Sequence, residues 1–236
     1  MDIQDEFIST VSHELRTPLT SIRGISQTLL TSWDKLDDET KKKFIKIIEE
    51  QSGRLINLVE NILTVSKMHN DVPVLRAVDV NSAVEKVIQM LSQKYPEHRI
   101  IKQFGVNLPM ASLDEDKFQQ IMTNLIDNAG KYSEKGSSVM VSTSSEGDSV
   151  VISVKDEGVG IKEEDLDKIY GKFCRLENHL TSKTQGNGLG LYITKALTES
   201  MKGQISVKST INEGTTFTVK FPVYSTEDAI KCSLQS

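Results

Sequence analysis

The chain has 236 residues, of which 37% are hydrophobic and 26% are charged, as is typical of a globular protein. Its net charge of -5 argues against broad nucleic-acid binding, which normally requires a basic face. No apolar run approaches the roughly 20 residues that span a bilayer, and Cys174 and Cys232 have no metal-ligand spacing. We therefore expect a cytoplasmic chain that contacts neither nucleic acid nor membrane.

The first 69 residues predict two long helices. Residues 1–31 carry apolar side chains at three- and four-residue steps, which is the helical period, at Ile8, Val11, Leu15, Leu19, Ile22 and Leu29. A turn follows at 33–36, and Asp37 is the expected N-cap of a second helix that runs to about His69. The apolar stripe of that helix consists of Phe44, Ile48, Leu55, Leu58, Ile62 and Val65.

Two helices joined by a short turn form a hairpin that buries little core of its own. Pairing two hairpins into a four-helix bundle would bury both apolar seams. We therefore predict a homodimer formed through residues 1–69. The alternative is a hairpin that packs on the C-terminal part of its own chain.

The rest of the chain predicts a mixed domain. Residues 70–73 are the expected linker, 74–225 the second domain and 226–236 a tail. Helices are predicted over 81–95, 114–132 and 189–201, strands over 99–104, 137–143, 149–155, 204–208 and 215–221, and a long loop over 171–188. Segregated helices and strands favour a two-layer α/β sandwich with a mixed, mostly antiparallel sheet.

His13 is a candidate nucleophile on the first predicted helix. At 100° per residue it lies nearly opposite the apolar stripe, with Thr17 one turn further on the same exposed face. Neutral imidazole is a good nucleophile near pH 7, and Glu14 could orient it or accept its proton. Pro18 cannot donate to the carbonyl of Glu14, so we expect a kink there. The alternatives are an ordinary surface histidine and, less well supported, a zinc ligand, which lacks the second histidine of His-Glu-x-x-His.

Asn124, Asn128 and Lys131 recur along one face of the predicted helix 114–132. Amide oxygens suit Mg²⁺, and a lysine ammonium neutralises phosphate, so this face could hold a magnesium polyphosphate. The alternative is a solvated polar face without a ligand.

Two glycine-containing segments could complete a nucleotide pocket. Asp156 ends a predicted strand, where its carboxylate could accept from the exocyclic amine of adenine beside Gly158 and Gly160. A second segment, with Gly186, Gly188 and Gly190, precedes a helix whose N-terminal N–H groups could face phosphate. The spacing is neither a dinucleotide fingerprint nor a Walker A motif, so any ATP site belongs to another fold. A simple Asp-Glu-Gly turn is the alternative for the first segment.

Taken in this order, the motifs resemble those of sensor histidine kinases of two-component signalling. Residues 1–69 resemble the dimerisation and histidine-phosphotransfer domain, and residues 74–225 resemble the ATP-binding domain shared with gyrase and Hsp90. The resemblance covers nearly the whole chain. It is also compatible with the cytoplasmic portion of a membrane-bound sensor.

The resemblance implies a role for each matching residue. His13 is the implied phosphoacceptor, Glu14 its acid/base partner, and Thr17 the residue that positions water for dephosphorylation of a regulator. Asn128 is the implied Mg²⁺ ligand. Contacts with ATP are implied for Asn124, Asn128, Lys131, Tyr132, Asp156, Gly158, Gly160, Phe173, Arg175, Gly186, Gly188, Gly190 and Thr215.

Three positions depart from the family pattern. Gly171 stands where an acidic residue is usual, Asn187 where Thr or Ser is common, and Gly130 interrupts a helix end that usually carries a larger residue. A glycine there could loosen the last helical turn. These departures bear on the rigidity of the loop and on rate, and they remove none of the implied catalytic groups.

The implied activity is autophosphorylation of His13 by ATP, followed by transfer to an aspartate of a response regulator that docks near Thr20–Leu30. Dephosphorylation of the regulator is an implied second activity. Three alternatives stay open: a nucleotide-gated dimeric scaffold without phosphotransfer, a protein in which the phosphatase dominates, and an ATPase of the chaperone or gyrase type.

Overall fold

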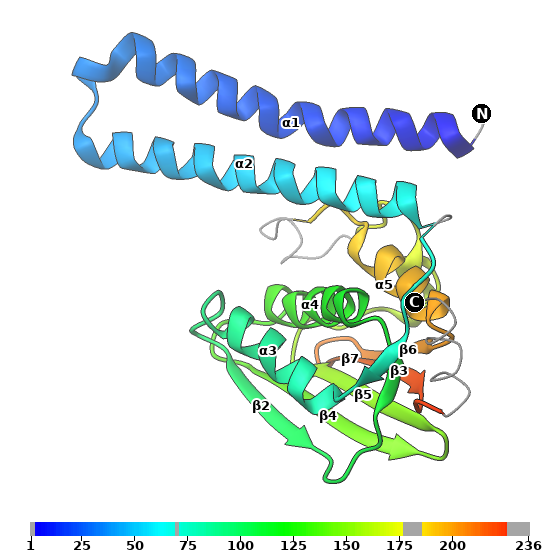
Figure 1. Cartoon of the computed structure of the whole chain (residues 1–236). Helices are drawn as coiled ribbons and strands as arrows, with labels where there is room; N and C mark the ends of the chain where they lie inside the picture. The colour runs from blue at the N-terminus through cyan, green and yellow to red at the C-terminus, as the bar shows by residue number, and fades with distance from the viewer. Residues whose placement is uncertain (1–2, 69–70, 177–185, 226–236) are drawn as a thin grey trace. The chain divides into compact units, whose positions relative to one another are not determined.

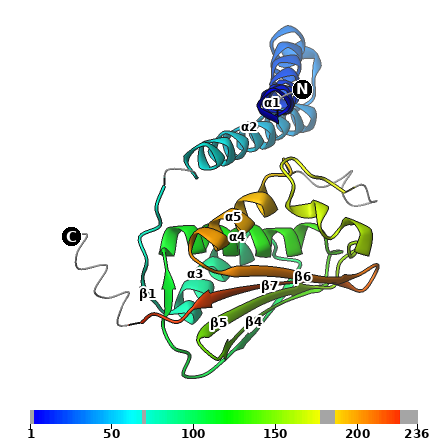
Figure 2. The ribbon, with the colours of Figure 1, turned by 90° about the vertical axis from the view of Figure 1, so that its right-hand side faces the viewer.

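A computed structural model describes residues 3–68, 71–176 and 186–225, and the side chains of residues 8 onward within these ranges. The chain forms two compact units (Figures 1 and 2). The first is a helical hairpin that extends to Ser66, and the second begins at Lys67. No helix in the described ranges is long and apolar enough to cross a membrane.

The hairpin consists of α1 (Ile3–Ser32), the short 3₁₀ turn η1 (Trp33–Lys35) and α2 (Asp38–Lys67). The two long helices run antiparallel, side by side (Figure 1). Asp37 caps α2 as predicted, because its Oδ1 accepts from the Thr40 N–H at 2.7 Å. α1 continues through Pro18, and the kink expected there stays a prediction.

The hairpin carries two sets of apolar side chains. Members of the predicted stripes such as Leu29 and Leu58 are buried. Ile8 and Leu19 of the same predicted stripe are 57% and 53% exposed in the single chain, as expected of a hairpin that buries little core of its own. One partner helix covers only part of the apolar arc that a helical wheel groups together. The other exposed apolar side chains of the hairpin include Leu30, Trp33, Ile45, Ile56, Val59 and Leu63.

The second unit alternates helices with strands along the chain. Its helices are α3 (Val80–Ser92), α4 (Glu115–Lys131) and α5 (Gly190–Ser200), with short 3₁₀ turns η2 (Glu163–Asp165) and η3 (Lys168–Tyr170). Its strands are β1 (Arg76–Val78), β2 (Arg99–Phe104), β3 (Ala111–Leu113), β4 (Ser138–Glu146), β5 (Ser149–Asp156), β6 (Gln204–Thr210) and β7 (Gly214–Pro222).

The main sheet has five strands in the order β2-β4-β5-β7-β6. Only the β2–β4 pair is parallel, so the prediction of a mixed, mostly antiparallel sheet is confirmed. α3, α4 and α5 cover one face of this sheet (Figure 2). β1 and β3 form a separate two-stranded pair that the sequence pattern did not predict, because three residues are too few to show an alternation.

The core of the second unit lies between the sheet and α4. Alternate residues of β5 and β7, such as Ile152 and Val219, are fully buried, as the period of two requires. Phe118 of α4 packs edge-on against Phe221 of β7, with ring centroids 5.7 Å apart. Asp114 caps α4 through the Lys117 N–H at 3.2 Å. The helix is thus anchored at its start and along its apolar face, which holds its polar face in a defined orientation.

Candidate functional site

His13 lies on an exposed face of α1. Thr17, one turn later, is also exposed and donates its hydroxyl to the His13 carbonyl at 3.3 Å. The Glu14 carboxylate accepts from Nη2 of Arg54 on α2 at 3.1 Å, and these two side chains are only 23% and 21% exposed. The imidazole is therefore accessible, while the second helix holds the neighbouring carboxylate in place.

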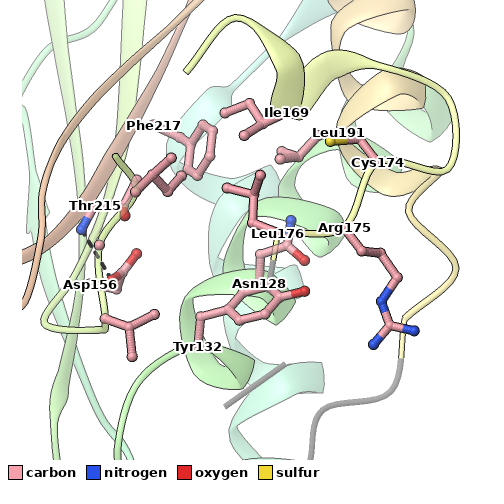
Figure 3. Close-up of a pocket in the computed structure, with 13 residues that line it drawn as sticks. Asn128, Tyr132, Asp156, Ile169, Cys174, Arg175, Leu176, Leu191, Thr215 and Phe217 are labelled. Carbon is pink, nitrogen blue, oxygen red and sulfur yellow. Dashed lines mark hydrogen bonds between the residues drawn. The ribbon is translucent and has the colours of Figure 1, made fainter. Parts of the chain in front are cut away.

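The second unit contains a pocket lined by residues from α4, the end of β5, the segment after η3, the start of α5 and β7 (Figure 3). Six predicted site residues line it, namely Asn128, Tyr132, Asp156, Gly160, Arg175 and Thr215. The other lining residues were not predicted and are mostly apolar: Val159, Ile161, Ile169, Cys174, Leu176, Leu191 and Phe217. The alternation along β7 could have indicated Phe217, whereas no local pattern marks Leu176 or Cys174.

Asp156 is the buried acid of this pocket, with 5% of its surface exposed. Its Oδ1 accepts from the Gly158 N–H at 2.8 Å. The same oxygen accepts from the Thr215 N–H at 3.1 Å (Figure 3). Burial raises its pKa to about 6, although the two backbone hydrogen bonds act in the opposite direction. No residue in the described ranges donates to Oδ2, so this oxygen can accept from a ligand.

Two glycines allow the chain to turn beside Asp156. A Cβ on Gly158 would lie 2.2 Å from the carbonyl oxygen of Tyr132, so only glycine lets this turn approach the end of α4. Gly160 has a φ of 68°, and a Cβ there would lie 2.1 Å from the carbonyl oxygen of Thr210. The turn that carries the acid is thereby pressed against both α4 and the end of β6.

The two asparagines of α4 have different surroundings. Nδ2 of Asn124 donates to the Gly190 carbonyl at 3.3 Å and to the Thr194 hydroxyl at 3.4 Å, which ties α4 to α5. Asn128 lines the pocket, and its side-chain amide makes no hydrogen bond within the described part of the chain. Its amide oxygen is therefore available and suits a magnesium ion.

Any cation bound here would depend on further ligands from its substrate. The described residues contain no group of three or more His, Cys, Asp or Glu side chains that could hold a metal. Mg²⁺ typically binds a few protein oxygens together with substrate phosphates, and Asn128 fits that arrangement.

Lys131 does not line the pocket in this structure. Its ammonium forms an ion pair with Asp127, one turn earlier on α4. Its implied contact with phosphate therefore stays a prediction. Tyr132 follows it directly and does line the pocket.

The remaining predicted residues lie around the long loop. Arg175 lines the pocket. Gly188, with a φ of 68°, lies against the backbone of Phe173, where a Cβ would come within 2.5 Å. Gly190 begins α5, and Gly186 precedes it. Most of the predicted loop, residues 177–185, lies outside the described residues.

Comparison with known families assigns both units. Residues 3–71 match the His Kinase A (phospho-acceptor) domain, and residues 113–225 match the Histidine kinase-, DNA gyrase B-, and HSP90-like ATPase family. The chain belongs to the sensor histidine kinase family. The resemblance inferred from the ordered motifs is thus confirmed.

Individual relatives of this chain agree with that assignment. The sensor protein SrrB of Staphylococcus aureus is 32% identical over 228 residues, which span 93% of this chain and 38% of SrrB. The structure of ShkA in complex with AMPPNP is 27% identical, covers 93% of this chain and 46% of that one, and has a TM-score of 0.67. ThkA in complex with the response regulator protein TrrA, 24% identical, has the same fold with a TM-score of 0.74 over 93% of this chain and 61% of that one.

The structure accounts for Gly130, one of the three positions at which this chain departs from the family pattern. α4 continues through it to Lys131, and Tyr132 donates its N–H to the Asn128 carbonyl at 3.0 Å, so the last turn is intact. A Cβ at Gly130 would lie 3.1 Å from three ring carbons of Tyr95. The missing side chain therefore leaves room for an aromatic ring.

Proposed function

We propose that this chain catalyses autophosphorylation of His13 by ATP and passes the phosphoryl group to an aspartate of a response regulator. The observation that carries the proposal is the joint placement of Asn128, Tyr132, Asp156 and Thr215 around one pocket, in a chain whose other unit exposes a histidine on a helix. The chain spans 38% of the length of SrrB, so the activity is proposed for this segment.

ATP fits the pocket by chemistry that the lining residues supply. The buried Asp156 would accept from the adenine amine, and apolar residues such as Ile169 and Phe217 would contact the base. Asn128 would contribute its amide oxygen to Mg²⁺ on the polyphosphate, and Lys131 would contact phosphate. The related ShkA contains AMPPNP, which supports this choice of ligand.

Transfer to His13 would be a direct displacement at the γ-phosphorus. An imidazole nitrogen forms the new N–P bond while the bond from phosphorus to the β,γ-bridging oxygen breaks, and ADP leaves with that oxygen. Glu14 would take the proton that the imidazole loses. Positioning and charge neutralisation provide most of the catalysis in such transfers, and the Arg54–Glu14 pair keeps the carboxylate oriented.

The hairpin is the proposed surface for two partners. Exposed apolar side chains such as Ile56 and Leu63 suit a second hairpin, and the two together would form the four-helix dimer. A response regulator would dock near Thr20–Leu30, below His13. ThkA, which shares the fold, was solved in complex with TrrA, a response regulator.

The decisive experiment incubates the protein with Mg²⁺ and γ-labelled ATP beside His13→Gln. We expect a label that is acid-labile and alkali-stable and that is absent from the variant, because His13 supplies the nitrogen of the phosphoramidate. ATP affinity should be unchanged in His13→Gln. No label despite intact ATP binding would contradict the kinase proposal and favour the nucleotide-gated scaffold.

A regulator phosphatase activity is proposed for Thr17. Its exposed hydroxyl lies one helical turn from His13, where it could position a water for attack on a docked phosphoaspartate. Thr17→Ala should preserve autophosphorylation and slow dephosphorylation of the regulator at least fivefold, measured with purified phospho-regulator. An equal loss of both activities would count against this role.

A further inference from the structure

Four side chains form a charged cluster at the C-terminal end of α4, beside the pocket. Asp127 lies at its centre with 15% of its side chain exposed. Its Oδ2 pairs with the ammonium of Lys131. Its Oδ1 accepts from the Lys94 ammonium at 2.6 Å and from the Tyr95 hydroxyl at 2.7 Å. The two carboxylate oxygens therefore have separate partners.

This division matters because Lys131 is the lysine expected to bind phosphate. A mostly buried carboxylate that lost its only cation would be strongly destabilised, which would oppose any movement of that cation toward a ligand. Here Lys94 and Tyr95 would stay on Oδ1 when Lys131 leaves Oδ2. Burial alone would raise the pKa of Asp127, but Lys131 and Lys94 outweigh it and hold the pKa below its usual value.

Gly130 leaves room for the Tyr95 ring at the end of α4. The ring of Tyr95 lies beside the Cα of Gly130. A Cβ on residue 130 would be only 3.1 Å from carbons of this ring. From that position its hydroxyl reaches Asp127 across the end of the helix. The glycine, the tyrosine and the acid thus form one packed unit next to Asn128 and Tyr132, both of which line the pocket.

We propose that Lys94 and Tyr95 are positioning residues for nucleotide binding. They hold Asp127 and compensate its charge, so that Lys131 exchanges its ion pair with Asp127 for one with the polyphosphate of ATP. This inference rests on the proposed function, because it takes Lys131 as a phosphate ligand. Neither Lys94 nor Tyr95 touches the nucleotide in this proposal; both act through Asp127.

The test compares dissociation constants for ATP·Mg²⁺ and for adenosine, measured by calorimetry or ligand competition. Lys94→Ala and Tyr95→Phe should each weaken ATP binding about three- to tenfold, the effect of one typical hydrogen bond. Adenosine has no phosphate, so its affinity should not change. Lys86→Ala is the matched control, since Lys86 of α3 forms an ion pair at 2.8 Å with Glu115, at the other end of α4 from Asp127.

A second set of variants tests whether Lys94 acts by compensating the charge of Asp127 or by attracting the phosphates of ATP over a distance. Asp127→Asn removes the charge that retains Lys131, so ATP should bind this variant at least as tightly as the wild type. Adding Lys94→Ala to Asp127→Asn should then have no further effect. A loss of affinity that persists in the double variant would show that Lys94 acts by long-range attraction and would overturn the inference.

The remaining outcomes are equally distinct. Equal weakening for ATP and adenosine would show that Lys94 and Tyr95 only maintain the fold, and unchanged ATP binding would show that they have no role; either result overturns the inference. If Lys131→Ala leaves ATP binding unchanged, the phosphate contact itself is wrong. If the wild-type protein binds neither ligand, the proposed function fails, and the inference fails with it.

Discussion

Asp156 shows how one residue combines burial with recognition. Its side chain is closed off from water, two backbone N–H groups hold one oxygen, and the second oxygen is left for a ligand. The same burial that excludes competing water also raises its pKa to about 6. Nucleotide recognition by this residue should therefore depend on pH in the range just below neutrality.

We expect adenosine to bind about tenfold more weakly at pH 5 than at pH 7.5. The ionised carboxylate is the stronger acceptor for the adenine amine, and one unit below a pKa of about 6 only about a tenth of it is ionised. Affinity is thus lost as pH falls through the pKa. Fluorescence or calorimetric titration at several pH values tests this, with adenosine chosen because it has no titrating phosphate.

Asp156→Asn is the control for that titration. The variant should bind adenosine weakly at every pH, because its amide nitrogen would face the adenine amine, and its affinity should not vary between pH 5 and 7.5. A wild-type profile that is flat, or a variant profile that still falls with pH, would assign the titration to another group.

At the scale of elements, α4 brings most of the site together. Its apolar face packs on the sheet through Phe118, its polar face carries Asn124 and Asn128, and its last turn meets the Asp156 turn at Gly158. Gly130 contacts Tyr95, so the turn that follows α3 also packs against this end of α4. A change at this helix end should therefore affect stability through its neighbours rather than through the helix alone.

Gly130→Ala should destabilise the protein even though alanine favours a helix by about 1 kcal/mol over glycine. The new methyl group would press on the Tyr95 ring and lengthen the hydrogen bond from its hydroxyl to Asp127. In a Tyr95→Ala background the same substitution should stabilise by about 1 kcal/mol, because only the helix preference remains. Urea unfolding of the four proteins measures both effects. If Gly130→Ala changes the free energy of unfolding in the same direction in both backgrounds, the Tyr95 ring does not cause the destabilisation.

At the scale of the whole molecule, the hairpin leaves apolar surface uncovered. Ile45, Ile56, Val59 and Leu63 recur along one side of α2 and are 45% to 59% exposed. These residues lie on a different side of the helix from Leu58 and Val65, which are buried. A helix with two apolar sides packs against more than one neighbour.

Ile56→Glu should convert the proposed homodimer into a monomer. A carboxylate placed among the apolar side chains of a helical interface would be desolvated without a partner, at a cost of several kcal/mol. Light scattering coupled to size-exclusion chromatography gives the molar mass. Asn57→Glu adds the same charge at the next exposed position of α2 and should remain dimeric. A wild-type protein that is already monomeric would contradict the four-helix arrangement.

Local sequence signals predicted most elements because their physical causes are local. Strand β7 follows from the alternation of Phe217, Val219 and Phe221 with polar residues. The capping role of Asp37 follows from a side chain that accepts from a nearby N–H. β1 and β3 were missed because they are stabilised by pairing with each other across more than 30 residues of chain. Ile8 and Leu19 belong to the predicted apolar stripe and are exposed in the single chain, because periodicity identifies an apolar side of a helix and does not show what covers it.

For the site, the sequence determined which chemical groups are present and in what order. His13, Asn128, Asp156 and the glycines could be recognised because reactive side chains and turns leave short motifs. Only the tertiary structure decided which groups share a pocket, that Asp156 is buried deeply enough to shift its pKa, and that Lys131 pairs with Asp127. Burial, and partners such as Lys94 some 30 residues away, arise from packing between distant segments, and no local pattern encodes that distance.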